Sequence, residues 1–453
     1  MKNSNGIIDH RPATFCHKTQ NSPKIDSLIF WAVMVNVLIP KAGFKIGGIP
    51  ITLGNILLFL LLIRTCIKPF RIKIKDKNFM FLFLLFPLYC FLRILIPSIA
   101  GTLEVSSAFS LMAASSVYPL IFPVIITKIR DDNQLETLTK VITACLFITM
   151  IYDILQAIFG IAAVQIPGIT VNYSDYANAP GHWWLLKYNG GSDNSKIFST
   201  YQNGNLYGVN MLMFYPLFSL YFRKNKGIFI CALMVVLFSI IVFLTGSRTV
   251  WIGALVYSCL LAFESIRYSK IKLKGLMITI IFLSFFAFSV GYFMSLFSTR
   301  MGRLFYSLNW SVLLAGGGRT EGVIRSFQWL FDNGNILHFL FGSYGTGGYA
   351  GAYEMTYFAI FFGYGIIGLI LWLLPIVLVS LRIRQKCIKS KDILLGGLYK
   401  GIFIYMACAF IDGGWWLPPT VINLWTLIAL AYKKMQFLPL KCKYHEHPLP
   451  QSM

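Results

Sequence analysis

The chain has 453 residues, of which 57% are hydrophobic and 13% are charged. Soluble proteins average roughly 45–50% apolar and about 25% charged residues, so this composition excludes an ordinary soluble protein and indicates a membrane protein. The formal net charge is +23, which in a soluble chain would suggest a nucleic-acid partner. The positions of the charges along the chain decide between these two explanations.

Apolar runs long enough to cross a bilayer are spread along the chain. A hydrocarbon core of roughly 30 Å needs about 20 mostly apolar residues as a helix. The runs therefore predict an all-α, polytopic integral membrane protein with about twelve transmembrane helices, in a range of eleven to thirteen. The spans are expected at 25–40, 49–67, 79–99, 107–127, 137–160, 205–222, 227–246, 249–266, 275–297, 355–380, 395–411 and 420–436.

The spans divide the chain into seven segments. The polar segment that precedes the first span is unlike a cleaved signal peptide, so we interpret it as a cytoplasmic tail. The segments are the tail at 1–24, five spans in 25–160, a long loop at 161–204, four spans in 205–297, a second long loop at 298–354, three spans in 355–436 and a tail at 437–453.

The basic residues lie mostly on one side of this arrangement. With the N-terminus inside, 30 of the 40 Lys and Arg residues fall in cytoplasmic segments, and both termini are then cytoplasmic. An excess of Lys and Arg in cytoplasmic loops is what orients membrane proteins. The positive charge is therefore an orientation signal, and no nucleic-acid partner is predicted. The nine cysteines avoid both long outer loops and show no metal-ligand spacing, so neither a disulfide framework nor a metal site is predicted.

The first long outer loop and the start of the next span combine aromatic, amide and hydroxyl side chains. Aromatic faces stack on sugar rings, and amide groups bind sugar hydroxyls, so this composition is typical of a glycan-binding surface. The alternative is an aromatic belt at the membrane interface. The candidate glycan-binding residues are Trp183, Trp184, Tyr201, Asn203 and Asn205.

The second long outer loop contains a predicted amphipathic helix. It is expected to have its N-cap at Thr320 and to end at Asn333 and Gly334. The apolar residues expected on one face are Val323, Ile324, Phe327, Leu330 and Phe331. Both long outer loops are expected to carry short amphipathic helices on the membrane surface. Both loops are also large enough to hold a functional site.

From residue 197 onward, the outer segments use arginine and no lysine. The arginines are Arg248, Arg300, Arg303, Arg319 and Arg325. Orientation does not require this choice, whereas the planar guanidinium binds phosphate or carboxylate groups through two hydrogen bonds. We therefore predict that some of these arginines hold a phosphorylated substrate.

Three of these arginines have distinct settings. Arg319 precedes the predicted helix, beside free N–H groups that favour anions. Arg325 follows Glu321 by four residues, which favours a surface ion pair. Arg248 lies in a short connection between two spans, where it could hold the phosphorylated substrate. The alternative is that its long side chain only extends to the membrane surface.

Asp153 is an acid inside a predicted span. An ionisable residue there is often functional. We expect it to pair with a polar neighbour such as Tyr152 or Gln156 rather than to relay protons, because a proton-driven transporter usually has more intramembrane charge.

Four stretches of the chain together resemble the bacterial superfamily of O-antigen ligases and O-antigen polymerases. The stretches are STYQNGNLYG (199–208), LTGSRTVWIG (244–253), GGRTEGV (317–323) and LFGSYGTGGYAGAYEMTYFAIFFGYGIIGLI (340–370). The resemblance implies a glycosyltransferase of the helical GT-C type in the bacterial inner membrane, with a periplasmic active site. Its donor would be an undecaprenyl-pyrophosphate-linked glycan, and no metal or other cofactor is implied.

The resemblance also implies roles for single residues. Arg248 and Arg319 correspond to the arginines taken to hold the pyrophosphate. The ligase branch begins the following span with a His-Asn pair, whereas this chain has Glu354 and no histidine there. This difference favours the polymerase branch and makes Glu354 the candidate base, with an ion pair to an outer arginine as the alternative. His338 is a second candidate base, although its apolar surroundings favour a packed side chain.

The resemblance leaves competing functions open. A polymerase would join lipid-linked repeat units into O-antigen or a related polysaccharide, with a chain-length regulator as a possible partner protein. A ligase would transfer the glycan to lipid A core. A transporter or flippase for lipid-linked sugar would need a charged path through the spans, for which Asp153 alone is poor evidence.

Overall fold

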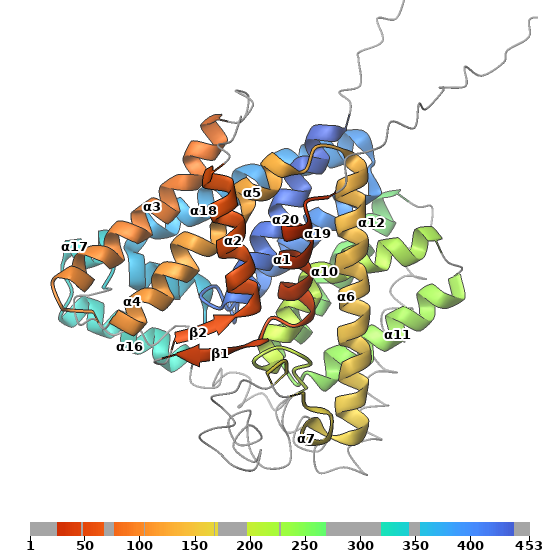
Figure 1. The fold of residues 1–453 in the computed structure, drawn as a ribbon, viewed down its shortest axis with the longest axis horizontal. Coiled ribbons are helices and arrows are strands. Elements are labelled where there is room, and N and C mark those ends of the chain that lie inside the picture. The colour runs from red at the N-terminus through yellow and green to blue at the C-terminus, as the bar shows by residue number, and fades with distance from the viewer. Residues whose placement is uncertain are drawn as a thin grey trace, which may run out of the picture.

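The computed structural model describes residues 25–46, 49–67, 77–103, 105–166, 168–170, 197–225, 228–268, 319–343 and 354–438, and these are mostly helical (Figure 1). The first half contains α1 (Ser27–Leu38), β1 (Gly43–Ile46), β2 (Ile49–Thr52), α2 (Leu53–Ile67), α3 (Lys77–Ile99), α4 (Val105–Met112), α5 (Ile121–Lys128), α6 (Asp132–Phe159) and α7 (Ile161–Val164). The second half contains α10 (Gly204–Asn225), α11 (Ile228–Leu244), α12 (Arg248–Tyr268), α16 (Arg319–Asp332), α17 (Ile336–Phe341), α18 (Thr356–Ser390), α19 (Ile393–Cys408) and α20 (Pro418–Phe437).

Helices occupy most of the described residues of the predicted spans. In the described part of the chain, four helical segments are long and apolar enough to cross a membrane: Lys77–Ile99, Ser107–Lys128, Asp132–Phe159 and Thr356–Ser390. Side chains on α3 such as Phe81 and Ile96 are more than 60% exposed, as expected where lipid rather than protein covers a helix. The span predicted at 275–297 lies outside the described residues, so the number of spans stays a prediction.

A short β-hairpin corrects the prediction that the span at 49–67 is helical from its first residue. The helix α2 begins at Leu53, and the preceding residues form β2, which pairs with β1 in antiparallel register from Gly43 opposite Thr52 to Ile46 opposite Ile49. Pro50 and the β-branched residues around it favour strand over helix. We call the end of the helix bundle that carries β1 and β2 the hairpin end (Figure 1).

The span predicted at 107–127 is helical but irregular. A π-helical turn at Ala113–Val117 and a 3₁₀ turn at Tyr118–Leu120 separate α4 from α5. Pro119 and Pro123 lack an N–H group, which prevents a regular α-helix through this region. The Ser115 hydroxyl accepts a hydrogen bond from Tyr364 at 3.0 Å and thereby joins this segment to α18.

An asparagine network joins α1, α10 and α20 inside the bundle. Asn210 donates from Nδ2 to Thr420 Oγ1 at 2.9 Å and accepts from Asn423 Nδ2 at 2.9 Å. Asn423 Nδ2 also donates to the Asn36 carbonyl at 3.3 Å. All four side chains are buried, where an amide without a partner would be costly. The network therefore fixes how the hairpin ends of α10 and α20 lie relative to each other.

Asp153 is fully buried in α6, but its predicted partners are engaged elsewhere. Tyr152 donates to the Val164 carbonyl at 2.6 Å, and Gln156 binds the backbone N–H and carbonyl of Ser199, both at 3.0 Å. Asp153 lies instead beside Tyr207 of α10. The expected pairing within α6 is therefore wrong, because the segment at 197–203 packs onto α6 and takes the amide of Gln156.

The helix in the second long loop lies close to its predicted position. α16 ends as expected, with the N–H groups of Asn333 and Gly334 bonded to carbonyls four residues back. The predicted N-cap is wrong, because α16 already begins at Arg319 and Thr320 lies inside it. The buried positions are Gly322 and Ser326, whereas Phe331 is 81% exposed.

The helix α18 is interrupted at Gly365, where φ is 73° and ψ is −177°. Backbone carbonyls freed within a membrane span must find partners inside the protein. Ser343 donates from both its N–H and its hydroxyl to the Phe362 carbonyl at 2.8 Å, and the Tyr89 hydroxyl donates to the Tyr364 carbonyl at 2.7 Å. The end of α17 is thus docked directly against the break.

Replacing Gly365 with alanine should destabilise the protein. A Cβ atom there would lie 2.2 Å from the Leu340 carbonyl oxygen, and the positive φ is itself unfavourable for alanine. We expect a loss of at least about 1–3 kcal/mol in unfolding free energy, measured as a lower melting temperature of the detergent-purified chain. The control is Gly396→Ala in α19, where the nearest atom to the new Cβ is 3.5 Å away. Equal melting temperatures for the two variants would contradict this account.

Candidate functional site

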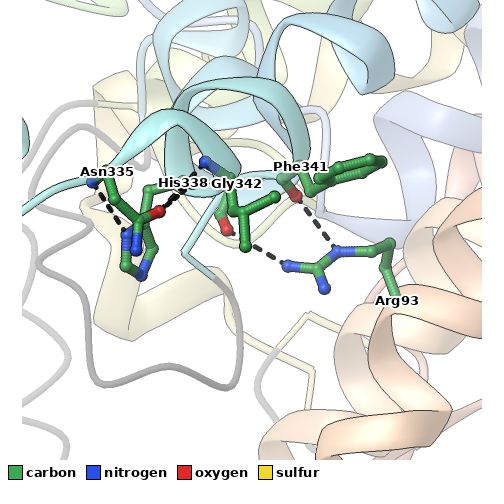
Figure 2. A pocket seen from close by; sticks show the side chains of 6 residues that line it. Arg93, Asn335, His338, Phe341 and Gly342 are labelled. Atoms are coloured by element: carbon green, nitrogen blue, oxygen red, sulfur yellow. Dashed lines mark hydrogen bonds between the residues drawn. The ribbon is translucent and has the colours of Figure 1, made fainter.

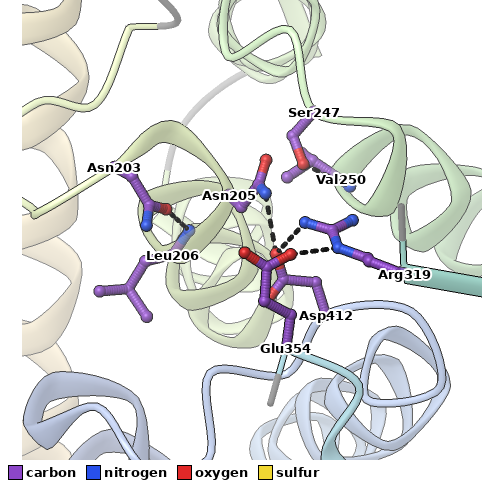
Figure 3. A network of polar contacts seen from close by, with 8 residues as sticks. All are labelled: Asn203, Asn205, Leu206, Ser247, Val250, Arg319, Glu354 and Asp412. Atoms are coloured by element: carbon purple, nitrogen blue, oxygen red, sulfur yellow. Dashed lines mark hydrogen bonds and ion pairs between the residues drawn. The ribbon is translucent and has the colours of Figure 1, made fainter. Parts of the chain in front are cut away.

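Arg319 brings together three segments that are far apart in the sequence. Its side chain extends from the first residue of α16 and donates from Nη2 to Asp412 Oδ2 at 3.0 Å. Its Nε donates to Glu354 Oε2. Glu354 lies just before α18, and Asp412 lies in the turn between α19 and α20 (Figure 3). We call these three residues the Arg319 cluster.

Asp412 is the most firmly held member of the Arg319 cluster. Its side chain is 11% exposed, and Oδ2 also accepts a hydrogen bond from Asn205 Nδ2 at 2.8 Å. A buried carboxylate needs such partners to offset its lost hydration. Asp412 therefore holds the guanidinium of Arg319 in a fixed position.

The turn that carries Asp412 is attached to the start of α18. The N–H of Gly413 donates to the Glu354 carbonyl at 3.1 Å. A side chain at position 413 could not be accommodated, because its Cβ would lie 2.1 Å from Thr356 Oγ1. Since this turn contacts the backbone of Glu354, the two carboxylates of the cluster share one rigid support.

Glu354 binds Arg319 in a more open setting. Its side chain is 56% exposed, whereas that of Arg319 is 22% exposed. Exposed ion pairs contribute little, typically about 0.2–1 kcal/mol. Another anion could therefore take the place of Glu354 at Nε, while Asp412 keeps its hold on Nη2.

Two helix N-termini lie beside the Arg319 cluster (Figure 3). At the start of α10, Asn203 Oδ1 accepts from the N–H of Leu206 at 2.8 Å. At the start of α12, Ser247 Oγ accepts from the N–H of Val250 at 3.4 Å. Helix N-termini carry partial positive charge, which favours anions nearby. The two helix N-termini thus add positive potential to that of the guanidinium, against the negative charges of Asp412 and Glu354.

Several predicted site residues have structural roles that can be described. Asn205 belongs to the network of the Arg319 cluster, and Asn203 caps α10. Tyr201 is 2% exposed and donates to the Val37 carbonyl at 2.9 Å, so its ring does not offer a face to a sugar. The aromatic residue was predicted from composition alone, and its burial against α1 corrects that prediction.

The remaining candidates are separate from the Arg319 cluster or outside the described part. Arg325 pairs with Glu321 on the exposed face of α16, as the spacing predicted. His338 caps α17, because its Nδ1 accepts from the N–H of Asn335 at 3.3 Å, and its ring also packs against Trp329 with the ring centroids 5.3 Å apart. Arg248 is the first residue of α12. The side chain of Arg248 lies outside the described part of the structure. The same is true of four predicted residues: Trp183, Trp184, Arg300 and Arg303.

Asp412 was not predicted as a site residue. The sequence offers one signal for it, an acid that directly follows an apolar span and precedes two glycines. That signal does not reveal the partners, Arg319 and Asn205, which are 93 and 207 residues away.

Comparison with known proteins adds no assignment. The chain matches no protein-family model, and a search of curated proteins gives no match. A functional interpretation therefore depends on the residues of the site.

The two carboxylates should differ in their contributions to stability. Asp412→Asn removes the charge from a nearly buried hydrogen bond to Arg319 and should cost about 1.5–3 kcal/mol. Glu354→Gln affects an exposed pair and should cost less than about 1 kcal/mol. Melting temperatures of the two detergent-purified variants measure the difference. A larger loss for Glu354→Gln would contradict the described division of roles.

Proposed function

We propose that this protein is an integral membrane glycosyltransferase that polymerises undecaprenyl-pyrophosphate-linked oligosaccharide repeat units. The observation that carries the proposal is the arrangement of Arg319, held by the nearly buried Asp412 on one side and by the exposed Glu354 on the other. The order of the four sequence stretches that resemble the O-antigen ligases and polymerases supports the same function.

The proposal includes a topology. About twelve helices of a GT-C-like protein cross the bacterial inner membrane, with both termini in the cytoplasm and the hairpin end in the periplasm. The excess of Lys and Arg in the opposite loops supports this orientation. It puts the Arg319 cluster where lipid-linked glycans would be available.

The proposed first step is an exchange of partners at Arg319. The donor pyrophosphate replaces Glu354 at Nε, while Asp412 continues to hold Nη2. Guanidinium binds phosphate oxygens through directed, charge-assisted hydrogen bonds. The N-termini of α10 and α12 favour the same charge. Arg248, at the start of α12, is the second proposed pyrophosphate ligand.

The exchange leaves Glu354 available as a base beside the bound donor. In the proposed reaction, an acceptor sugar hydroxyl attacks the anomeric carbon of the donor, and the bond from that carbon to the pyrophosphate oxygen breaks. The lipid pyrophosphate leaves with the electron pair, and Glu354 takes the hydroxyl proton. Arginine stabilises the negative charge that develops on the leaving group.

The outcome of disrupting the gene distinguishes a polymerase from a ligase. We expect lipopolysaccharide or a related surface glycan capped with a single repeat unit, visible as the loss of the long-chain ladder on a gel. Bare core together with accumulated lipid-linked glycan would indicate a ligase and contradict the proposal.

Substitution of the arginines tests the site within the intact chain. Arg319→Ala and Arg248→Ala should insert normally but reduce polymer formation by about 100-fold or more, as expected when a group that stabilises transition-state charge is lost. Arg382→Ala, an exposed change on the distant half of α18, is the matched control and should leave polymer length unchanged. Wild-type polymer from the Arg319 variant would refute the assignment.

A further inference from the structure

A cavity separate from the Arg319 cluster lies where α17 meets α3. Its volume is about 540 Å³. The lining residues are Arg93, Asn335, Leu337, His338, Phe341 and Gly342 (Figure 2). None of them belongs to the Arg319 cluster, so this cavity is a second site with its own chemistry.

The acceptor groups around the cavity are already used. Arg93 donates from Nε to the Phe341 carbonyl at 3.0 Å and from Nη2 to the Gly342 carbonyl at 3.1 Å. Asn335 Oδ1 accepts from the N–H groups of Leu337 at 3.0 Å and His338 at 3.1 Å. His338 Nδ1 accepts from the N–H of Asn335 at 3.3 Å.

The polar groups that remain are hydrogen-bond donors. Because Nδ1 of His338 is an acceptor, a neutral ring carries its proton on Nε2. The Nη1 group of Arg93 and the Nδ2 amide of Asn335 are also donors, and the described residues that line the cavity include no carboxylate. Both Arg93 and His338 line the cavity, and Figure 2 shows Gly342 between them. A cavity with donors and one fixed positive charge is suited to an anion.

Exposed apolar side chains lie at this cavity and on the last turns of α3. Leu337 and Phe341 line it, and Leu337 is 59% exposed. On α3, Ile96 and Ile99 are 63% and 78% exposed. Arg93 lies six residues before the end of α3, which is roughly 9 Å along the axis of a candidate membrane span. A long basic side chain near the end of a membrane span can reach the lipid headgroups, while exposed apolar residues beside it suit the lipid chains.

We propose that this cavity binds the phosphate group of an anionic membrane lipid. Arg93, His338 and Asn335 donate hydrogen bonds to the phosphate oxygens, and Leu337 and Phe341 contact the first part of the lipid chain. The site does not depend on the proposed glycosyl transfer, since it uses a different set of residues.

The test uses His338 because Arg93 also supports the backbone of α17, so that its replacement would disturb folding. His338→Glu keeps an acceptor that can reach back to the N–H of Asn335, as glutamate does in a capping box, but gives the cavity a negative charge. The matched control is His338→Gln, whose amide supplies both the acceptor and a donor.

The full-length chain, purified in detergent, is titrated with phosphatidylglycerol and, separately, with phosphatidylcholine, and bound lipid is counted by native mass spectrometry. We expect His338→Glu to weaken phosphatidylglycerol binding by about tenfold or more, and His338→Gln by less than about threefold. Phosphatidylcholine has the same phosphodiester but a cationic choline that compensates its charge, so it should bind more weakly than phosphatidylglycerol and lose less affinity in His338→Glu. Unchanged phosphatidylglycerol binding by His338→Glu would overturn the proposal. Inorganic phosphate that binds as tightly as the lipid would overturn the assignment to a lipid.

Discussion

The ion pair between Arg319 and Asp412 holds together the segments that form the candidate site. An aspartate that is 11% exposed needs charged or polar partners, and Arg319 and Asn205 supply them. These contacts join the start of α16, the start of α10 and the turn before α20. The guanidinium is consequently held beside two helix N-termini, with one of its edges facing the more exposed Glu354. A site of this form has one fixed carboxylate and one that another anion can replace.

A second constraint connects this site to the neighbouring cavity. Within a bilayer, the break in α18 at Gly365 requires partners for the freed carbonyls, and the end of α17 provides them through Ser343. Arg93 of α3 then binds the carbonyls of Phe341 and Gly342. Since α16 and α17 adjoin in sequence, the backbone requirement at the break also limits where α16 can start. The backbone contacts at the break therefore support the cavity and restrict the position of α16, which carries Arg319.

The sequence predicted the helices better than the partners of individual side chains. Apolar runs mark helices such as α3, α6 and α18 because their length and hydropathy are local properties. Arg319 was identified from its chemistry and its place before a helix. Asp412 was missed because its partners are distant in sequence. Tyr201 was assigned to sugar binding from composition, which does not reveal that its side chain is buried against α1. The short β-hairpin was missed because the strand residues Ile49–Thr52 continue directly into an apolar helix.

Binding of undecaprenyl pyrophosphate to the purified full-length chain tests the exchange of partners at Arg319 most directly. If the pyrophosphate replaces Glu354, Glu354→Gln should bind it up to about fivefold more tightly, because an exposed ion pair of at most about 1 kcal/mol no longer competes. Asp412→Asn should bind it more weakly, since the guanidinium is no longer held in place. Weaker or unchanged binding by Glu354→Gln would contradict the account.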